Sequence, residues 1–231
     1  MRKPIYLLAG GNWRRSNALI PVFENILAET GKKRPQVAYV GVANGDDPSF
    51  FDFFKSFLSN AGSSNVKQIL LARDRADVKS AQSILGEADA IFVAGGGVDE
   101  GMRWLIQHNL VSFMRQLYNN GALFFGLSAG SIMLGEKWVR WRNPDDDSTA
   151  ELFACMQIAP IVCDTHAEED DWEELKVAVK LLGNDGVGYG IPTGGCVRVA
   201  ADFALTALTK NTVCYINKAN RAVKSHDLPV A

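Results

Sequence analysis

Short apolar runs alternate with longer segments of helical periodicity through the first half of the chain. The runs are rich in β-branched and aromatic residues, whereas the segments between them are amphipathic or polar. This alternation predicts β-α units that build a parallel sheet. The predicted strands are PIYLLAG (4–10), VAYVGVA (37–43), VKQILLA (66–72), AIFVAGG (90–96) and ALFFGLS (122–128).

The predicted strands at residues 90–94 and 122–126 are apolar at nearly every position. A sheet with one face in water would carry polar residues at alternate positions, so helices must cover both faces here. We therefore predict an α/β fold, a three-layer α/β/α sandwich around a mostly parallel sheet.

Helices are predicted where apolar residues recur at helical spacing. Ser16 is a candidate N-cap for a helix that runs toward Gly31, and further helices are expected over residues 98–119 and 168–182. Residues 141–153, WRNPDDDSTAELF, read as a loop. The later runs CVRVA and VCYIN are expected to be antiparallel or edge strands. No repeat or linker divides the chain, so residues 1–231 are expected to form one domain.

Composition and charge narrow the classes of function. The chain is 47% hydrophobic and 22% charged, with a net charge of −2, so no basic field draws it to nucleic acid. The first apolar run, residues 5–9, is too short for a signal peptide or a membrane span, so we expect a cytoplasmic protein with no membrane partner. Cys155, Cys163, Cys196 and Cys214 lack the spacing of zinc sites and are expected to be buried free thiols. We expect no metal and no cofactor.

The chemistry is concentrated in the segment ALFFGLSAGSIMLG. Gly126, Ser128 and Gly130 form a G-x-S-x-G sequence between an apolar strand and a helix-compatible run, the context of a nucleophile elbow. The serine must project from a sharp turn, and the residues two before and two after it approach too closely for side chains. A turn of small residues without catalytic meaning is the alternative.

A nucleophilic serine needs a base, and the sequence has three histidines. His108 falls inside a predicted helix and His226 lies in the polar C-terminal segment. His166 follows an apolar run and is expected at a strand end, where a loop presents catalytic side chains. His166 is therefore the predicted base, with a surface histidine as the alternative.

A carboxylate and an oxyanion hole would complete the site. The loop between Ser128 and His166 supplies Asp145, Asp146 and Asp147 as candidates to orient the imidazole, with Asp145 preferred and solvated turn residues as the alternative. The amides of Gly97 and Ala129 are predicted to bind the oxyanion, since both turns lie at the carboxyl edge of the sheet. Read as a phosphate-binding motif, the glycine run fails the G-x-G-x-x-G spacing at Glu100.

These features together resemble the S51 serine peptidases, the group of dipeptidase E (aspartyl dipeptidase) and cyanophycinase. The resemblance rests on GGG at residues 95–97, GLSAGS at 126–131, His166, and GYGIP at 188–192. It implies a fold like that of class I glutamine amidotransferases, with flavodoxin-like topology. It also implies a serine peptidase that cleaves small peptides through an acyl-enzyme, with the same residues in the roles given above.

Two departures from the family pattern bear on the substrate. Thr193 stands where aspartyl dipeptidases carry a glutamate after the proline, and the stretch after His166, AEEDDWEEL, is acidic. We call Glu168, Glu169, Asp170 and Asp171 the acidic rim, which is expected to disfavour an acidic substrate and to favour a basic or free-amino one.

Two other functions stay open at this stage. One is a non-catalytic binding or regulatory protein with the same fold, in which the elbow is a structural turn. An ester-cleaving α/β-hydrolase fits less well, because such chains are longer and place the histidine farther past the serine. The sequence also leaves open whether the chain forms a homodimer.

Overall fold

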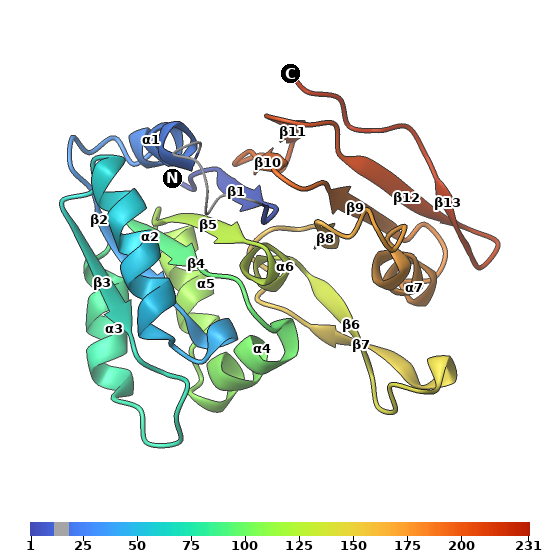
Figure 1. Cartoon of the computed structure of the whole chain (residues 1–231), viewed down its shortest axis with the longest axis horizontal. Helices are drawn as coiled ribbons and strands as arrows, with labels where there is room; N and C mark the ends of the chain where they lie inside the picture. The colour runs from blue at the N-terminus through green and yellow to red at the C-terminus, as the bar shows by residue number, and fades with distance from the viewer. Residues whose placement is uncertain (12–18) are drawn as a thin grey trace.

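A seven-stranded sheet is the centre of the computed structural model, which describes residues 1–11 and 19–231 (Figure 1). Its strand order is β11-β10-β1-β5-β4-β2-β3. Five neighbouring strands are parallel: β1 (Ile5–Leu8), β2 (Gln36–Val40), β3 (Asn65–Ile69), β4 (Ala90–Val93) and β5 (Leu123–Leu127). Two antiparallel strands extend the sheet beyond β1: β10 (Cys196–Val199) and β11 (Leu205–Ala207).

The central strands are buried on both faces, as their continuous apolar sequences predict. In β4, Ile91 and Val93 join one hydrophobic cluster while Phe92 joins the other, because successive side chains of a strand point to opposite faces. Phe92 is fully buried, and its ring contacts those of Phe54 at 5.2 Å and Phe125 at 4.9 Å between centroids.

Helices cover both faces of the sheet, so the predicted three-layer sandwich is confirmed (Figure 1). The Phe92 side is covered by α1 (Leu19–Ala28) and α2 (Pro48–Asn60). The Ile91 side is covered by α3 (Val78–Glu87), α4 (Val98–Gln107), α5 (Val111–Asn119) and α6 (Ala129–Leu134). A single turn of 3-10 helix, η2 (Val42–Asn44), follows β2.

Two predicted helices differ in their bounds. Residues 98–119 form α4 and α5 instead of one helix, because Asn109 adopts a left-handed φ of 56° that ends the first one. The helix predicted from residue 168 begins later, as α7 (Glu173–Leu181), since Asp171 and Trp172 also have positive φ. The predicted cap Ser16 lies outside the described residues.

Two smaller sheets complete the fold. A four-stranded sheet has the order β13-β12-β9-β8, and β6 (Lys137–Trp141) pairs with β7 (Ala150–Ala154) in a hairpin that was not predicted. The antiparallel pairing expected for CVRVA and VCYIN is confirmed in β10 and β12. The strands of the four-stranded sheet are β8 (Cys163–Thr165), β9 (Val187–Ile191), β12 (Val213–Lys218) and β13 (Arg221–Lys224).

The hairpin changes the reading of residues 141–153. Residues 142–149 do connect the strands, with a 3-10 turn η3 (Asp147–Thr149), but residues 150–153 belong to β7. The four cysteines are buried and free, as predicted. Across the described ranges, none of the helices has the length and apolar character needed to cross a membrane.

Truncation of Phe92 should be strongly destabilising. We expect Phe92→Ala to lower the free energy of unfolding by about 3–5 kcal/mol, because a cavity replaces a ring packed among aromatic neighbours. Phe203→Ala, at a position that is 41% exposed, should cost less than about 1 kcal/mol. Urea denaturation of both variants measures the difference, and equal losses would contradict the assignment of Phe92 to the core.

Candidate active site

Ser128 occupies a strained turn between β5 and α6. Its backbone has φ 54° and ψ −126°, a conformation that costs a serine about 1–3 kcal/mol and that surrounding contacts must enforce. One such contact is the hydrogen bond from Ser128 N to the carbonyl of Leu8 on the neighbouring strand, at 2.8 Å. Ser128 is only partly buried, so a substrate can reach its hydroxyl.

The two glycines of the motif allow this turn to form. A Cβ on Gly126 would lie 2.6 Å from backbone atoms of Gly130 and Ser131, and one on Gly130 would lie 2.0 Å from the carbonyl oxygen of Val93. Real Cβ atoms do not approach backbone this closely, so side chains at either position would force the strand and helix apart. The crowding expected from the sequence is present.

His166 reaches Ser128 from the four-stranded sheet. It directly follows β8 with a φ of 48°, and its backbone N–H donates to the carbonyl of Ile191 at 2.9 Å. Its Nε2 lies 2.7 Å from Ser128 Oγ. The structure therefore brings the predicted nucleophile and the predicted base into hydrogen-bond contact across 38 positions of sequence.

Glycines on two loops leave just enough room for this pair. A Cβ on Gly10, in the loop after β1, would lie 3.0 Å from His166 Cδ2 and 3.7 Å from Ser128 Cβ. A Cβ on Gly95, after β4, would lie 3.1 Å from Ser128 Cβ and 3.6 Å from its Oγ. The pair therefore lies between the loops that follow β1 and β4.

The structure does not bring Asp145 to His166. Asp145 is exposed in the connection between β6 and β7, which projects from the body of the molecule away from α6 and β8 (Figure 1). Asp146 lies in the same connection and accepts hydrogen bonds from the backbone and hydroxyl of Ser148, which makes it a turn former. The prediction that Asp145 orients the His166 imidazole is therefore wrong for this structure.

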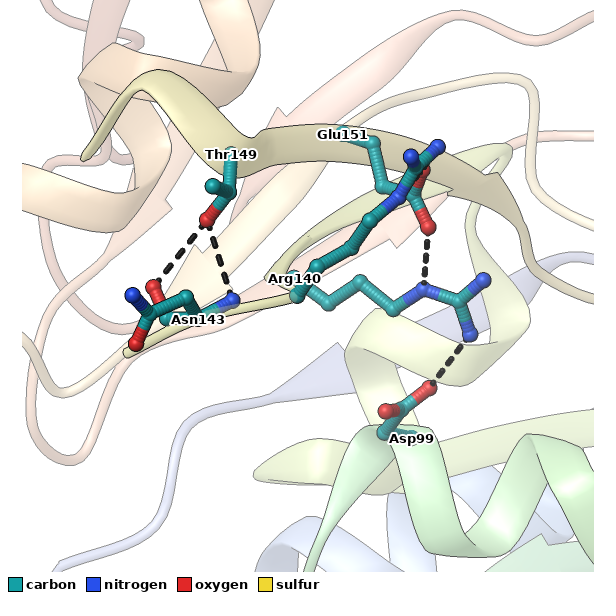
Figure 2. A network of polar contacts seen from close by, with 6 residues as sticks. Asp99, Arg140, Asn143, Thr149 and Glu151 are labelled. Atoms are coloured by element: carbon teal, nitrogen blue, oxygen red, sulfur yellow. Dashed lines mark hydrogen bonds and ion pairs between the residues drawn. The ribbon is translucent and has the colours of Figure 1, made fainter. Parts of the chain in front are cut away.

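Polar contacts hold this hairpin in its own position (Figure 2). Arg140 donates to Glu151 at 2.9 Å across the two strands and pairs with Asp99 of α4 at 3.4 Å. At the end of the hairpin, Thr149 Oγ1 accepts from Asn143 N at 3.1 Å and donates to its carbonyl at 3.0 Å. An exposed ion pair thereby links the hairpin to α4, while its strands pack against α6 and α7.

Among the side chains that the structure describes, which do not include that of Asp147, no carboxylate is hydrogen-bonded to the His166 ring. Two positions after His166, the carboxylate of Glu168 accepts hydrogen bonds from Thr193 N at 2.6 Å and from Thr193 Oγ1 at 3.2 Å. This contact joins the loop after β8 to the turn after β9. Sequence reasoning missed it, although the unusual Thr193 and the nearby Glu168 were both visible.

One backbone amide of the glycine turn at residues 95–97 already donates a hydrogen bond within the protein. Gly97 N–H donates to the carbonyl of Ala43 at 2.7 Å, so the prediction that it binds an oxyanion is corrected. For Gly95 and Gly96, no acceptor is recorded within the described part of the chain. Ala129 N–H is the first amide of α6, where helix geometry provides no intrahelical acceptor.

Three residues of the acidic rim have hydrogen-bond or ion-pair partners of their own. Glu168 binds Thr193, Asp171 pairs with Lys176 at 2.8 Å, and Asp170 accepts from Trp172 N at 3.1 Å. These contacts occupy three of the four carboxylates that the sequence offered for a basic substrate. Of these contacts, the one with Lys176 is an ion pair, and the other two are hydrogen bonds from neutral groups, which leave a carboxylate charged.

A further carboxyl lies buried beside the rim. Asp164 in β8 is 5% exposed, and its Oδ2 has no partner among the described residues. The pKa of Asp164 is raised to about 7, mainly by burial and to a smaller extent by the charges of Glu174, Asp170 and Glu168, against the opposing hydrogen bond from Thr165 N. Asp164 thus carries little negative charge in slightly acidic solution.

The other histidines lie elsewhere. His108 stacks on Trp104, and its Nε2 is 2.9 Å from the carbonyl of Leu71, while His226 contacts Ser225. The described residues contain no cluster of three or more histidine, cysteine or acidic side chains arranged to hold a metal ion.

The chain is similar to known proteins in sequence and in fold. A family model described as peptidase family S51 matches residues 5–206. Peptidase E of Haemophilus influenzae is 26% identical over 209 residues, which cover 85% of this chain and 92% of that protein. Peptidase E of Actinobacillus pleuropneumoniae is 22% identical over 228 residues, 94% of both chains. The crystal structure of a peptidase from an acI-B1 Actinobacterium matches the fold with a TM-score of 0.74 at 15% identity, covering 99% of this chain and 97% of that chain.

A methyl group on Gly10 should disturb the Ser128–His166 contact. Gly10→Ala places a Cβ 3.0 Å from His166 Cδ2 and 3.4 Å from Nε2, so the ring must move. We expect a fluorophosphonate to react with Ser128 at least about tenfold more slowly, because a catalytic pair is sensitive to small displacements. Gly86→Ala is the control, since its Cβ has no neighbour within 4 Å. An unchanged rate in Gly10→Ala would refute the arrangement.

Proposed function

This chain belongs to peptidase family S51, and we propose that it hydrolyses small peptides with Ser128 as nucleophile and His166 as general base. The observation that carries the proposal is the 2.7 Å contact between Ser128 Oγ and His166 Nε2 on a strained strand-to-helix turn. Relatives named peptidase E and the serine at the elbow support peptide-bond cleavage.

In the first half of the proposed reaction, Ser128 Oγ attacks the carbonyl carbon of the peptide bond while its proton passes to His166 Nε2. The tetrahedral intermediate then collapses, the C–N bond breaks, and the imidazolium gives its proton to the leaving amine. The product at this stage is an ester between Ser128 and the acyl part of the substrate.

In the second half, His166 Nε2 takes a proton from water, which attacks the ester carbonyl, and the proton returns to Ser128 as the acid leaves. The oxyanion formed in each half needs two amide donors. We assign one to Ala129 at the start of α6. The other is an amide of Gly95 or Gly96, because Gly97 is occupied and Gly95 packs directly against Ser128.

His166 is held mainly by its backbone and its loop in this proposal. The hydrogen bond from His166 N to Ile191 and the contact of Glu168 with Thr193 join the same two segments on either side of the imidazole. We propose Glu168 as a positioning residue that acts through this loop, in place of an orienting aspartate.

A non-catalytic binding protein is the second candidate function. It is favoured by the observation that none of the described carboxylates meets the His166 ring. Such a protein would keep the elbow as a structural turn, and its Ser128 would not react with serine-directed reagents.

Labelling with a broad fluorophosphonate separates the two functions. We expect wild-type protein to be modified at Ser128, and Ser128→Ala to lose both labelling and about 10³-fold or more of its kcat/KM on dipeptides. Asp145→Asn should keep its activity within about twofold, because an exposed charge on the hairpin contributes little to the site. A folded wild-type protein that is not modified would favour the non-catalytic function.

Removal of the Glu168 carboxylate tests the positioning role. We expect Glu168→Ala to slow labelling of Ser128 by about tenfold, because the loop of His166 loses its bond to Thr193. Glu168→Gln should restore most of the rate, since its amide oxygen can still accept from Thr193 N. Glu169→Ala, at the adjacent exposed position, is the matched control. If the alanine variant at 168 labels at the wild-type rate, Glu168 has no positioning role.

A further inference from the structure

Two residues of η2 hold the glycine turn at residues 95–97 in place. Gly97 N–H donates to the carbonyl of Ala43 at 2.7 Å. The side chain of Asn44 adds a second hydrogen bond, from its Nδ2 to the carbonyl of Gly95 at 3.0 Å. Of these two bonds, only the second is made by a side chain, so a substitution can remove it.

The side-chain amide of Asn44 has a fixed orientation. Its Oδ1 accepts from Asp47 N at 3.2 Å, and its Nδ2 is also 3.4 Å from the hydroxyl of Tyr39. Only one placement of the oxygen and the nitrogen lets the amide accept from a backbone N–H and donate to a carbonyl at once. Tyr39 is fully buried, and Asp47 caps α2 by accepting from Ser49 N. The amide therefore lies between two fixed parts of the fold.

The loop that carries Asn44 is also held from its other side. Asp46 Oδ2 accepts from the backbone N–H groups of Leu71 at 2.6 Å and Ala72 at 2.7 Å, just after β3. Gln68 Nε2 in β3 donates to the carbonyl of Asp46 at 3.0 Å. A shift of this loop would break these bonds, so Asn44 presents its donor to the glycine turn from a rigid support.

The bond from Asn44 fixes the direction of a neighbouring N–H. The peptide bond between Gly95 and Gly96 is trans and planar, so its N–H points away from its carbonyl. Strand β4 lies between β2 and β5, with Asn44 after β2 and Ser128 after β5. A Gly95 carbonyl directed at Asn44 therefore directs the Gly96 N–H toward the side of Ser128. A Cβ on Gly95 would lie 3.6 Å from Ser128 Oγ, so this peptide unit is close to the serine hydroxyl.

On the basis of the proposed function, we infer that Asn44 is a positioning residue for the oxyanion site. Its hydrogen bond to the Gly95 carbonyl holds the Gly96 N–H as the second oxyanion donor, beside the N–H of Ala129. Preorganised amides stabilise the charge of a tetrahedral intermediate because they need not reorient as the charge forms. Of the two glycine amides that the proposed mechanism allows, Gly96 is then the donor.

Two substitutions remove the Asn44 donor in different ways. Asn44→Asp keeps the shape of the side chain and the acceptor for Asp47 N, but it directs a carboxylate at the Gly95 carbonyl. Asn44→Ala removes the whole amide without adding a charge. Gln68→Glu is the matched control, because it replaces the same kind of donor to a backbone carbonyl of the same loop, that of Asp46.

The experiment measures fluorophosphonate inactivation of each folded variant, as the rate constant at saturation, kinact, and the half-saturating concentration, KI. The phosphoryl oxygen takes the place of the oxyanion as the bond to Ser128 forms. We expect both Asn44 variants to lower kinact at least about tenfold with KI within about twofold, because a misdirected amide weakens the transition state and not the first complex. Gln68→Glu should keep kinact within about threefold. On a dipeptide that the wild-type protein cleaves, kcat should fall in the Asn44 variants while KM stays within about twofold.

The outcomes separate the role of Asn44 from the catalytic proposal. An unchanged kinact in both Asn44 variants, or an equal loss in Gln68→Glu, overturns the positioning role and leaves the peptidase function in place. A raised KI with an unchanged kinact also overturns it, since Asn44 would then act on binding alone. A folded wild-type protein that is not labelled at Ser128 overturns the proposed function, and the positioning role fails with it.

Discussion

The close packing of β5 against α6 is the constraint on which the rest of this structure depends. Gly126 must approach Gly130, and Gly130 must approach the carbonyl of Val93, more closely than any side chain permits, and Ser128 between them adopts a positive φ. The turn carries the hydroxyl to the carboxyl edge of the sheet, where open α/β folds bind ligands. The strain is supported by fully buried strands on both sides, whose cores leave the turn no room to relax.

The site itself is assembled from two sheets. Ser128 belongs to the large parallel sheet, while His166 comes from the end of β8 and is tied to β9 through the carbonyl of Ile191. The Glu168–Thr193 contact reinforces the same junction. The position of the imidazole against the serine hydroxyl thus depends on how the four-stranded sheet packs. None of the described carboxylates is bonded to the ring.

Two hollows lie near the Ser128–His166 pair. Gly10 and Leu127 line one of them, and Gly96 and Gly97 line the other. The conspicuous acidic run after His166 mostly satisfies neighbouring backbone and lysine groups.

Sequence patterns alone predict the parallel strands, the three layers and the sharp turn at Ser128, because side-chain period and glycine crowding act over a few neighbouring residues. They also point to His166, one of three histidines, as the partner of Ser128, and the structure brings the two into contact. The folded chain was needed to see that Asp145 lies exposed on the β6–β7 hairpin and that Gly97 donates to Ala43. The contact of Glu168 with Thr193 is likewise visible only there. Such contacts join segments far apart in the chain, and an aspartate in a loop has the same local sequence signature whether it binds a histidine or water.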